Sequence, residues 1–211
     1  PKLAKPAPAK KQDIPTPPPT VEIPQETDDP WPQASELTEL VARGSIWQYW
    51  DQGALPGNNW RQLNFSTENW KEGTAPLGYG EKDGSIKSEI GFGADPKNKH
   101  IAYLFRHVFQ APPKAKFKTL WLRFQVDDGC VIYLNGQELS RLGMGDGRWP
   151  GPRQLAKVKG AQQDAESQLH RFRIDNPPRL RRGDNIIAVR VHQANKTSSD
   201  LRMDLELHGQ R

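Results

Sequence analysis

Residues 117–126 have the sequence FKTLWLRFQV, and this stretch decides the fold. Within it, the apolar residues Leu120, Leu122, Phe124 and Val126 stand at every second position. Successive side chains of a β-strand point to opposite faces of its sheet, so this period of two predicts a strand with one buried face. The residues between them are then expected on the solvent side.

Three further stretches have the character of strands. Residues 201–207 (LRMDLEL) alternate in the same way, and their charged residues are predicted to face solvent. In residues 186–193 (IIAVRVHQ), Ile187, Val189 and Val191 share one face, and residues 101–109 (IAYLFRHVF) form another predicted strand.

A hairpin is predicted between residues 130–134 and 137–141, because Asn135-Gly136 separates them and this pair favours a two-residue turn. Many short strands joined by connections rich in Gly and Pro are typical of an all-β fold. The sequence therefore predicts an antiparallel jelly-roll β-sandwich.

The first 34 residues differ in character from the rest of the chain. Ten of the 19 prolines fall in residues 1–32, and Trp31 is the single aromatic there. Proline fixes the backbone and removes a hydrogen-bond donor, so we expect residues 1–34 to form an extended arm or linker. We expect one β-sandwich domain over residues 35–211, beginning with a short helix at 35–43.

The charge of the chain raises the question of nucleic acid. The net charge is +5, and residues 35–211 hold 26 basic against 20 acidic residues. The densest basic clusters, in residues 114–118 and 179–182, each follow a proline pair, so they are interpreted as solvated turns at strand ends rather than as a groove lined by basic residues and stacking aromatics. We expect no nucleic-acid partner.

No apolar run approaches the roughly 20 residues of a membrane-spanning helix, so we do not expect the body of the protein to be embedded in a membrane. Cys130 is the single cysteine of the sequence, which excludes an internal disulfide.

Five segments of the sequence occur together in a characteristic order: residues 44–53, 59–81, 103–109, 126–147 and 180–207. In this order they resemble the galactose-binding-domain-like β-sandwich modules that accompany metallophosphoesterase, lamin-tail and glycan-processing domains in secreted bacterial proteins. The resemblance implies a jelly-roll sandwich, usually non-catalytic, used for recognition or as an accessory module. It also implies an extracytoplasmic location.

Asp127 and Asp128, followed by Gly129, lie between two predicted strands. Adjacent carboxylates can bind Ca²⁺, which takes six to eight oxygen ligands, and Asp200 is a candidate to complete the site. The alternative is an Asp-Gly turn in which the carboxylates bond local amides. A structural calcium is the one cofactor that the sequence suggests.

The candidate residues for binding a ligand or partner are aromatic or basic. Trp149 and its neighbour Arg148 lie in the long loop 143–168, where an aromatic side chain has no predicted core role. Trp50 and Trp60 are candidates for a platform that stacks on sugar rings, although a structural role is the alternative for both.

Catalysis is not expected from this sequence. None of the five histidines falls in an HExxH motif, and no nucleophile elbow, phosphate-binding loop or dinucleotide fingerprint occurs. The first hypothesis is a non-catalytic recognition and assembly module, an accessory subunit that docks to a partner protein chain along residues 1–34 and through its loops. The alternative is a carbohydrate-binding module that delivers a linked hydrolase to glycan.

Overall fold

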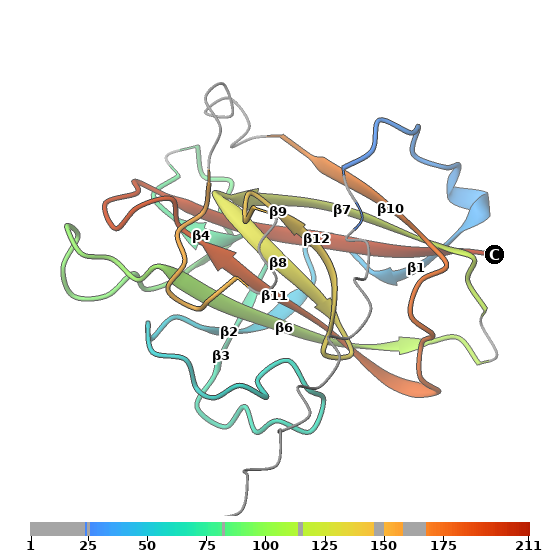
Figure 1. Ribbon diagram of the computed structural model, residues 1–211, viewed down its shortest axis with the longest axis horizontal. Coiled ribbons are helices and arrows are strands. Elements are labelled where there is room, and N and C mark those ends of the chain that lie inside the picture. Colours follow the sequence, from blue (N-terminus) through green and yellow to red (C-terminus); the bar gives the residue numbers. More distant parts are fainter. Residues whose placement is uncertain (1–23, 25, 82, 114–115, 146–149, 158–167) are drawn as a thin grey trace, which may run out of the picture.

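The computed structural model describes residues 24, 26–81, 83–113, 116–145, 150–157 and 168–211. Its elements form two six-stranded sheets, shown in Figure 1. In chain order they are a 3-10 turn η1 (Ala34–Glu36), β1 (Leu37–Val41), β2 (Ile46–Trp50), β3 (Lys71–Thr74), β4 (Leu77–Tyr79), β5 (Ser88–Glu89), β6 (Ala102–Ala111), β7 (Thr119–Asp127), β8 (Gly129–Leu134), β9 (Gln137–Leu142), β10 (His170–Asp175), β11 (Gly183–His192) and β12 (Leu201–Gln210).

The first sheet has the strand order β10-β7-β12-β4-β5, with β1 also paired to β12. The second has the order β3-β2-β6-β11-β8-β9. All pairs are antiparallel except β4 with β5. Buried side chains of both sheets form one apolar core, which includes Leu122 and Leu205 from the first sheet and Phe105 and Val189 from the second. The predicted all-β sandwich is confirmed.

The predicted strands and the predicted hairpin occur where the sequence places them. Asn135 and Gly136 connect β8 to β9 with φ values of 52° and 87°. Two consecutive positive φ values are what a type I′ turn requires, and Asn-Gly adopts them readily.

The predicted helix at 35–43 is wrong. Residues Ala34–Glu36 form a single 3-10 turn, and Leu37–Val41 form strand β1, in which Leu37 lies opposite Gln210. The backbone groups along the second half of β12 need hydrogen-bond partners, and β1 supplies them while burying Val41 in the core. This tertiary pairing overrides the local helix signal of the sequence.

The sequence predicts that the charged residues of 201–207 face solvent, but in the structure the carboxylates on this outer face of the first sheet are buried. Asp204 and Glu206 are only 2% and 6% exposed. Glu206 accepts hydrogen bonds from Arg123 Nε at 2.6 Å and from His208 Nε2 at 3.0 Å. Arg43 Nε pairs with Asp204 Oδ2 at 3.1 Å. Alternation identifies the side chains that point away from the core, but it does not tell whether another segment covers them.

Part of the predicted arm covers the region of this face around Trp121 and His208. Glu26 forms a β-bridge with Phe172 of β10, and Thr27 N donates to the carbonyl of Arg171 at 2.9 Å. The Trp31 ring lies 4.4 Å from the Arg123 guanidinium and 5.8 Å from the Trp121 ring. Residues 26–34 therefore pack on the sandwich, and residues 1–23 of the predicted arm lie outside the described residues.

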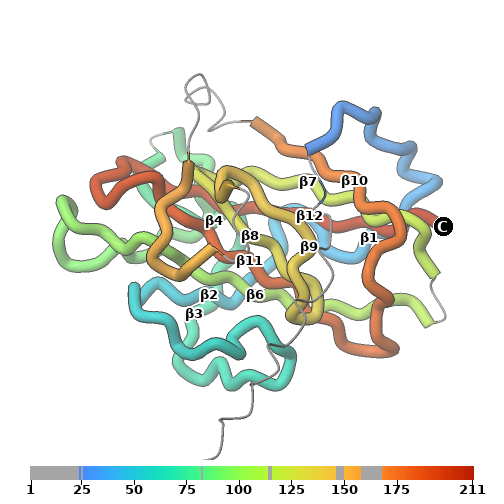
Figure 2. Tube along the Cα trace, in the orientation of Figure 1, coloured from blue at the N-terminus to red at the C-terminus, as the bar shows by residue number. Residues whose placement is uncertain are grey.

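The outer face of the second sheet carries its own cover. The segment between β2 and β3 passes below the strands in Figures 1 and 2, and its Trp60 joins Leu104 and Tyr133 in a second apolar cluster. Arg106 of β6, which is 2% exposed, donates to the carbonyls of Gln62 at 2.9 Å and Phe65 at 3.3 Å. This buried arginine ties the covering segment to the sheet. Cys130 of β8 is fully buried in the main core, and burial raises its pKa.

Replacing Arg106 with methionine should detach that segment. Methionine fills similar space but leaves the two carbonyls without their charged donor, so we expect Arg106→Met to lower the free energy of unfolding by about 2–3 kcal/mol. Urea denaturation measures the change, and exposed Arg153→Met is the matched control, with an effect within about 0.5 kcal/mol. Equal midpoints for Arg106→Met and wild type would contradict the tie.

The stability of the chain should fall in acid partly because of Glu206. Burial alone would raise the pKa of Glu206, but the bonds from His208 and Arg123 outweigh it and lower the pKa from 4.5 to about 2. The contribution of Glu206 is therefore complete above about pH 4.5 and is lost as the pH falls towards 2.

Glu206→Gln should remove this part of the acid sensitivity. Between about pH 6 and pH 3, we expect the variant to lose less stability than wild type, by a few kcal/mol at most. Urea unfolding at both pH values measures the difference. Exposed Glu68→Gln should keep the wild-type pH dependence. Parallel pH profiles for Glu206→Gln and wild type would refute the assignment.

Candidate ligand-binding site

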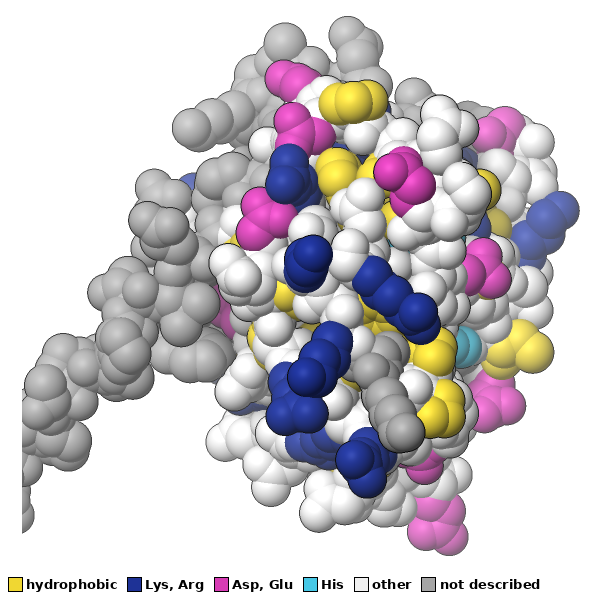
Figure 3. Space-filling model, turned by 90° about the vertical axis from the view of Figure 1, so that its right-hand side faces the viewer, with side chains coloured by type: hydrophobic (Ala, Val, Ile, Leu, Met, Phe, Trp, Pro, Cys, Tyr) yellow, Lys and Arg dark blue, Asp and Glu magenta, His cyan; other side chains and the backbone are white. Residues whose placement is uncertain are grey.

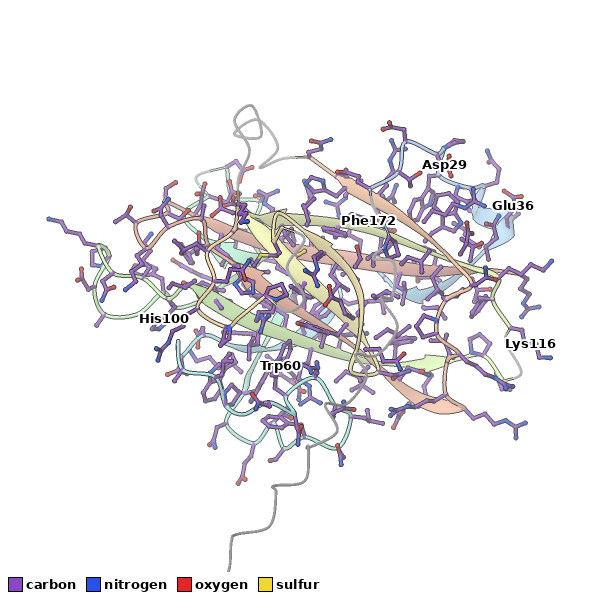
Figure 4. The ribbon with its side chains drawn as sticks, viewed as in Figure 1. Asp29, Glu36, Trp60, His100, Lys116 and Phe172 are labelled. Carbon is purple, nitrogen blue, oxygen red and sulfur yellow. The ribbon has the colours of Figure 1, made fainter. Side chains whose placement is uncertain are left out.

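The two basic clusters of the sequence lie side by side at one end of the sandwich. They belong to the connections β6–β7 and β10–β11, and Asn176 N donates to the carbonyl of Lys118 across them at 2.9 Å. Lys116 marks this end in Figure 4, and basic side chains gather on the same face in Figure 3. We call it the basic end; its exposed cations include, among the described residues, Lys116, Lys118, Arg179, Arg181 and Arg182.

A cavity of about 290 Å³ opens between these two connections. Apolar side chains form much of its lining, and Lys116 and Arg179 contribute one cation from each connection. The full lining is Lys116, Phe117, Leu120, Pro177, Pro178, Arg179 and Leu180. The part of the chain that the structure describes thus places two cations and no carboxylate in this lining.

The apolar part of the cavity depends on a glycine in the neighbouring strand. The Phe117 ring lies directly against Gly209 of β12, so that a Cβ atom there would stand 2.5 Å from Phe117 Cδ1. Phe117 and Leu180 are partly buried and pack against the main core. The core therefore supports the cavity from beneath.

Asn185 fixes the arginine-rich connection. Its Oδ1 accepts hydrogen bonds from Arg181 N at 2.8 Å and Asn135 Nδ2 at 2.9 Å, while its Nδ2 donates to the carbonyls of Arg181 and Gly183. Asn185 is fully buried. The backbone that carries the arginines is thus held in place, while their side chains reach solvent.

Two carboxylates near the basic end, those of Asp175 and Asp184, are bonded to other groups of the protein. Asp175 accepts from Thr119 Oγ1 at 2.9 Å and pairs with Arg173 at 3.2 Å. Asp184 is hydrogen-bonded to Gln110. This end of the molecule is therefore suited to an anionic or strongly hydrogen-bonding ligand.

The predicted metal ligands lie at the opposite end of the strands. Asp128 Oδ2 accepts from Ala194 N at 2.6 Å, Asp200 Oδ1 accepts from Ser199 Oγ at 2.7 Å, and the side chains of Asp127 and Asp128 are hydrogen-bonded. Burial raises the pKa of Asp128. Hydrogen bonds from neighbouring groups to these carboxylates are what we expect if Asp127 and Asp128 belong to an Asp-Gly turn rather than to a calcium site. Within the described ranges, no group of three or more acidic, His or Cys side chains could hold a metal ion, and the calcium stays a prediction.

Another buried carboxylate, that of Asp51, lies near His100, which Figure 4 labels far from Lys116. Asp51 accepts from Lys71 Nζ at 2.9 Å and from Gly91 N at 2.8 Å. Burial raises the pKa of Asp51, but these bonds outweigh it, and the net shift is downward. Its donors come from the protein, so Asp51 has a structural role.

The predicted aromatic platform is not formed by Trp60. This ring is 1% exposed, lies nearly parallel to Trp70 at 6.5 Å and meets the edge of Tyr133 at 5.8 Å, because it anchors the cover of the second sheet. Trp50 is half-buried beside Trp70, and its Nε1 donates to the carbonyl of Ala54 at 2.6 Å. Arg148 and Trp149 lie outside the described residues.

Comparison with known proteins bears on the fold. No family model and no curated protein sequence matches the chain. Among solved structures it is similar to β-glucuronidase from Ruminococcus gnavus in complex with uronic isofagomine, with 11% identity and a TM-score of 0.53 over 88% of this chain. The β-glucuronidase from that organism in complex with D-glucuronic acid gives 11% identity and a TM-score of 0.52 over 88%.

This likeness concerns the fold alone. The chain spans 31% of the length of either enzyme structure, so it resembles one portion of a much larger protein. In the described part of the chain, no helix is long and apolar enough to cross a membrane.

Asn185→Ala should loosen the basic end. The alanine leaves the Arg181 amide and the Asn135 side chain without their acceptor, so we expect unfolding to become easier by about 2–3 kcal/mol. Hydrogen exchange followed by mass spectrometry should show faster exchange over residues 179–186. Exposed Asn98→Ala is the control and should leave that exchange unchanged. Unchanged exchange in Asn185→Ala would show that Asn185 does not hold the connection.

Proposed function

We propose that this chain is a non-catalytic carbohydrate-binding module that serves a glycan-processing protein, with the cavity at the basic end as its site. The observation that carries the proposal is this cavity, which combines apolar and hydrogen-bonding walls on a sandwich whose fold resembles a portion of β-glucuronidases. Ligand pockets usually combine an apolar lining with a few polar groups that set orientation.

The size of the cavity suits one sugar ring of a longer saccharide. Its volume of about 290 Å³ is near the lower bound of roughly 300 Å³ for ligand pockets. Phe117 and the proline pair offer apolar surface to the C–H face of a sugar. Lys116 and Arg179 supply donors to its oxygens.

The comparisons favour this alternative over the docking hypothesis. The β-glucuronidase likeness supports a role with glycans, and nothing comparable supports a protein partner along residues 1–34. In addition, residues 26–34 of that arm contact the chain's own sandwich. The partner chain, the extracytoplasmic location and the absence of catalysis remain predictions.

A glycan array tests the proposal with two matched phenylalanine variants. Phe117 and Phe92 are both partly buried against the main core, but only Phe117 lines the cavity. We expect the wild-type chain to bind at least one class of glycan, Phe117→Ala to weaken that binding at least tenfold, and Phe92→Ala to retain it. Thermal melts of both variants verify folding. Failure to bind any glycan, or equal loss in both variants, would sink the proposal.

A further inference from the structure

We infer that the cavity at the basic end selects acidic saccharides, whose carboxylate or sulfate groups are held by Lys116 and Arg179. This inference rests on the proposed function and names its ligand class. The starting point is that two cations from separate connections line one small cavity. An anion bound in this cavity would interact favourably with both cations.

Arg179 is suited to this task by its shape. A guanidinium donates two parallel hydrogen bonds to a carboxylate or sulfate, whereas an ammonium such as that of Lys116 acts as a compact charge. Among the residues that the structure describes, the cavity lining contributes no carboxylate, and nearby Asp175 and Asp184 are bonded to other protein groups. The positive charge of these two side chains is thus available to a ligand.

The apolar lining argues against a simple inorganic anion. Phe117, Leu120 and Leu180 would gain little from contact with a phosphate or sulfate ion. An acidic sugar offers both features at once, because its ring has an apolar C–H face and its substituent carries the charge. The combination of lining residues therefore favours a uronic acid or sulfated sugar.

The surroundings extend the site beyond one sugar. Lys118, Arg181 and Arg182 are exposed at the same end but do not line the cavity. Asn185 holds the backbone of the β10–β11 connection on either side of Arg182, through its bonds to Arg181 and Gly183. Lys118 lies on the neighbouring β6–β7 connection, where its carbonyl accepts from Asn176 N. A saccharide with an acidic group on successive residues would meet them in turn, and counterion release would make its binding depend on salt.

The test uses a hexamer of galacturonate and its fully methyl-esterified form as probes, with binding followed by calorimetry. Lys116→Gln/Arg179→Gln removes the two cavity cations. Lys97→Gln/Arg153→Gln removes two exposed cations elsewhere and leaves the same net charge. We expect the acidic hexamer to bind at least tenfold more tightly than the ester, with affinity that falls as salt rises. The cavity variant should lose at least tenfold, and the control variant less than twofold.

Several outcomes would overturn the inference. They are equal binding of acid and ester, equal loss in the two double variants, and a hexaglutamate peptide that binds as tightly as the hexamer, since charge alone would then suffice. If neutral glycans bind and only Phe117→Ala abolishes their binding, the proposed function stands and the acidic selectivity is wrong. If no glycan of either kind binds, both fail.

Discussion

Burial of apolar side chains between β7 and β12 on one side and β6 and β11 on the other is the constraint on which the molecule depends. It aligns the strands, so every connection emerges at one of two ends. The connections β6–β7 and β10–β11 emerge together, since β7 pairs with β10 and β6 with β11. The cavity is a consequence of this register, and its lining residues Phe117 and Leu180 rest on the same core.

Both outer faces of the sandwich are covered, and polar side chains hold the covers in place. Arg106 binds the carbonyls of the segment after β2, and Arg123 lies beneath Trp31 of the N-terminal segment. A buried charged side chain is costly unless it is bonded, so buried Arg106 fixes the position of the segment that it binds. Arg123 is half-buried, and its guanidinium lies against the Trp31 ring. A segment of the chain therefore packs on part of the outer face of each sheet, in addition to the core between the two sheets.

The sequence could predict what depends on local pattern. Alternation in residues 117–126 and the Asn135-Gly136 pair were sufficient for the strands and the hairpin. The burial of Glu206 and Trp60 depends on contacts with segments distant in the chain, and the periodicity of a strand does not predict such contacts. The helix expected at 35–43 failed for the same reason, because pairing with β12 decides that segment. The two basic clusters can be found in the sequence, but only the order of the strands shows that they lie side by side. The proline pair Pro177-Pro178 marks a connection in the sequence, and it also lines the cavity.

The burial of Cys130 has a practical consequence. Its thiol is the only one in the chain and has no exposed surface in the folded state. Thiol reagents need an accessible thiolate, so the native protein should resist them. A cysteine engineered at the mouth of the cavity would then be the single position that accepts a fluorophore. A fluorophore at that position would report on binding in the cavity, and the native Cys130 would not have to be replaced first.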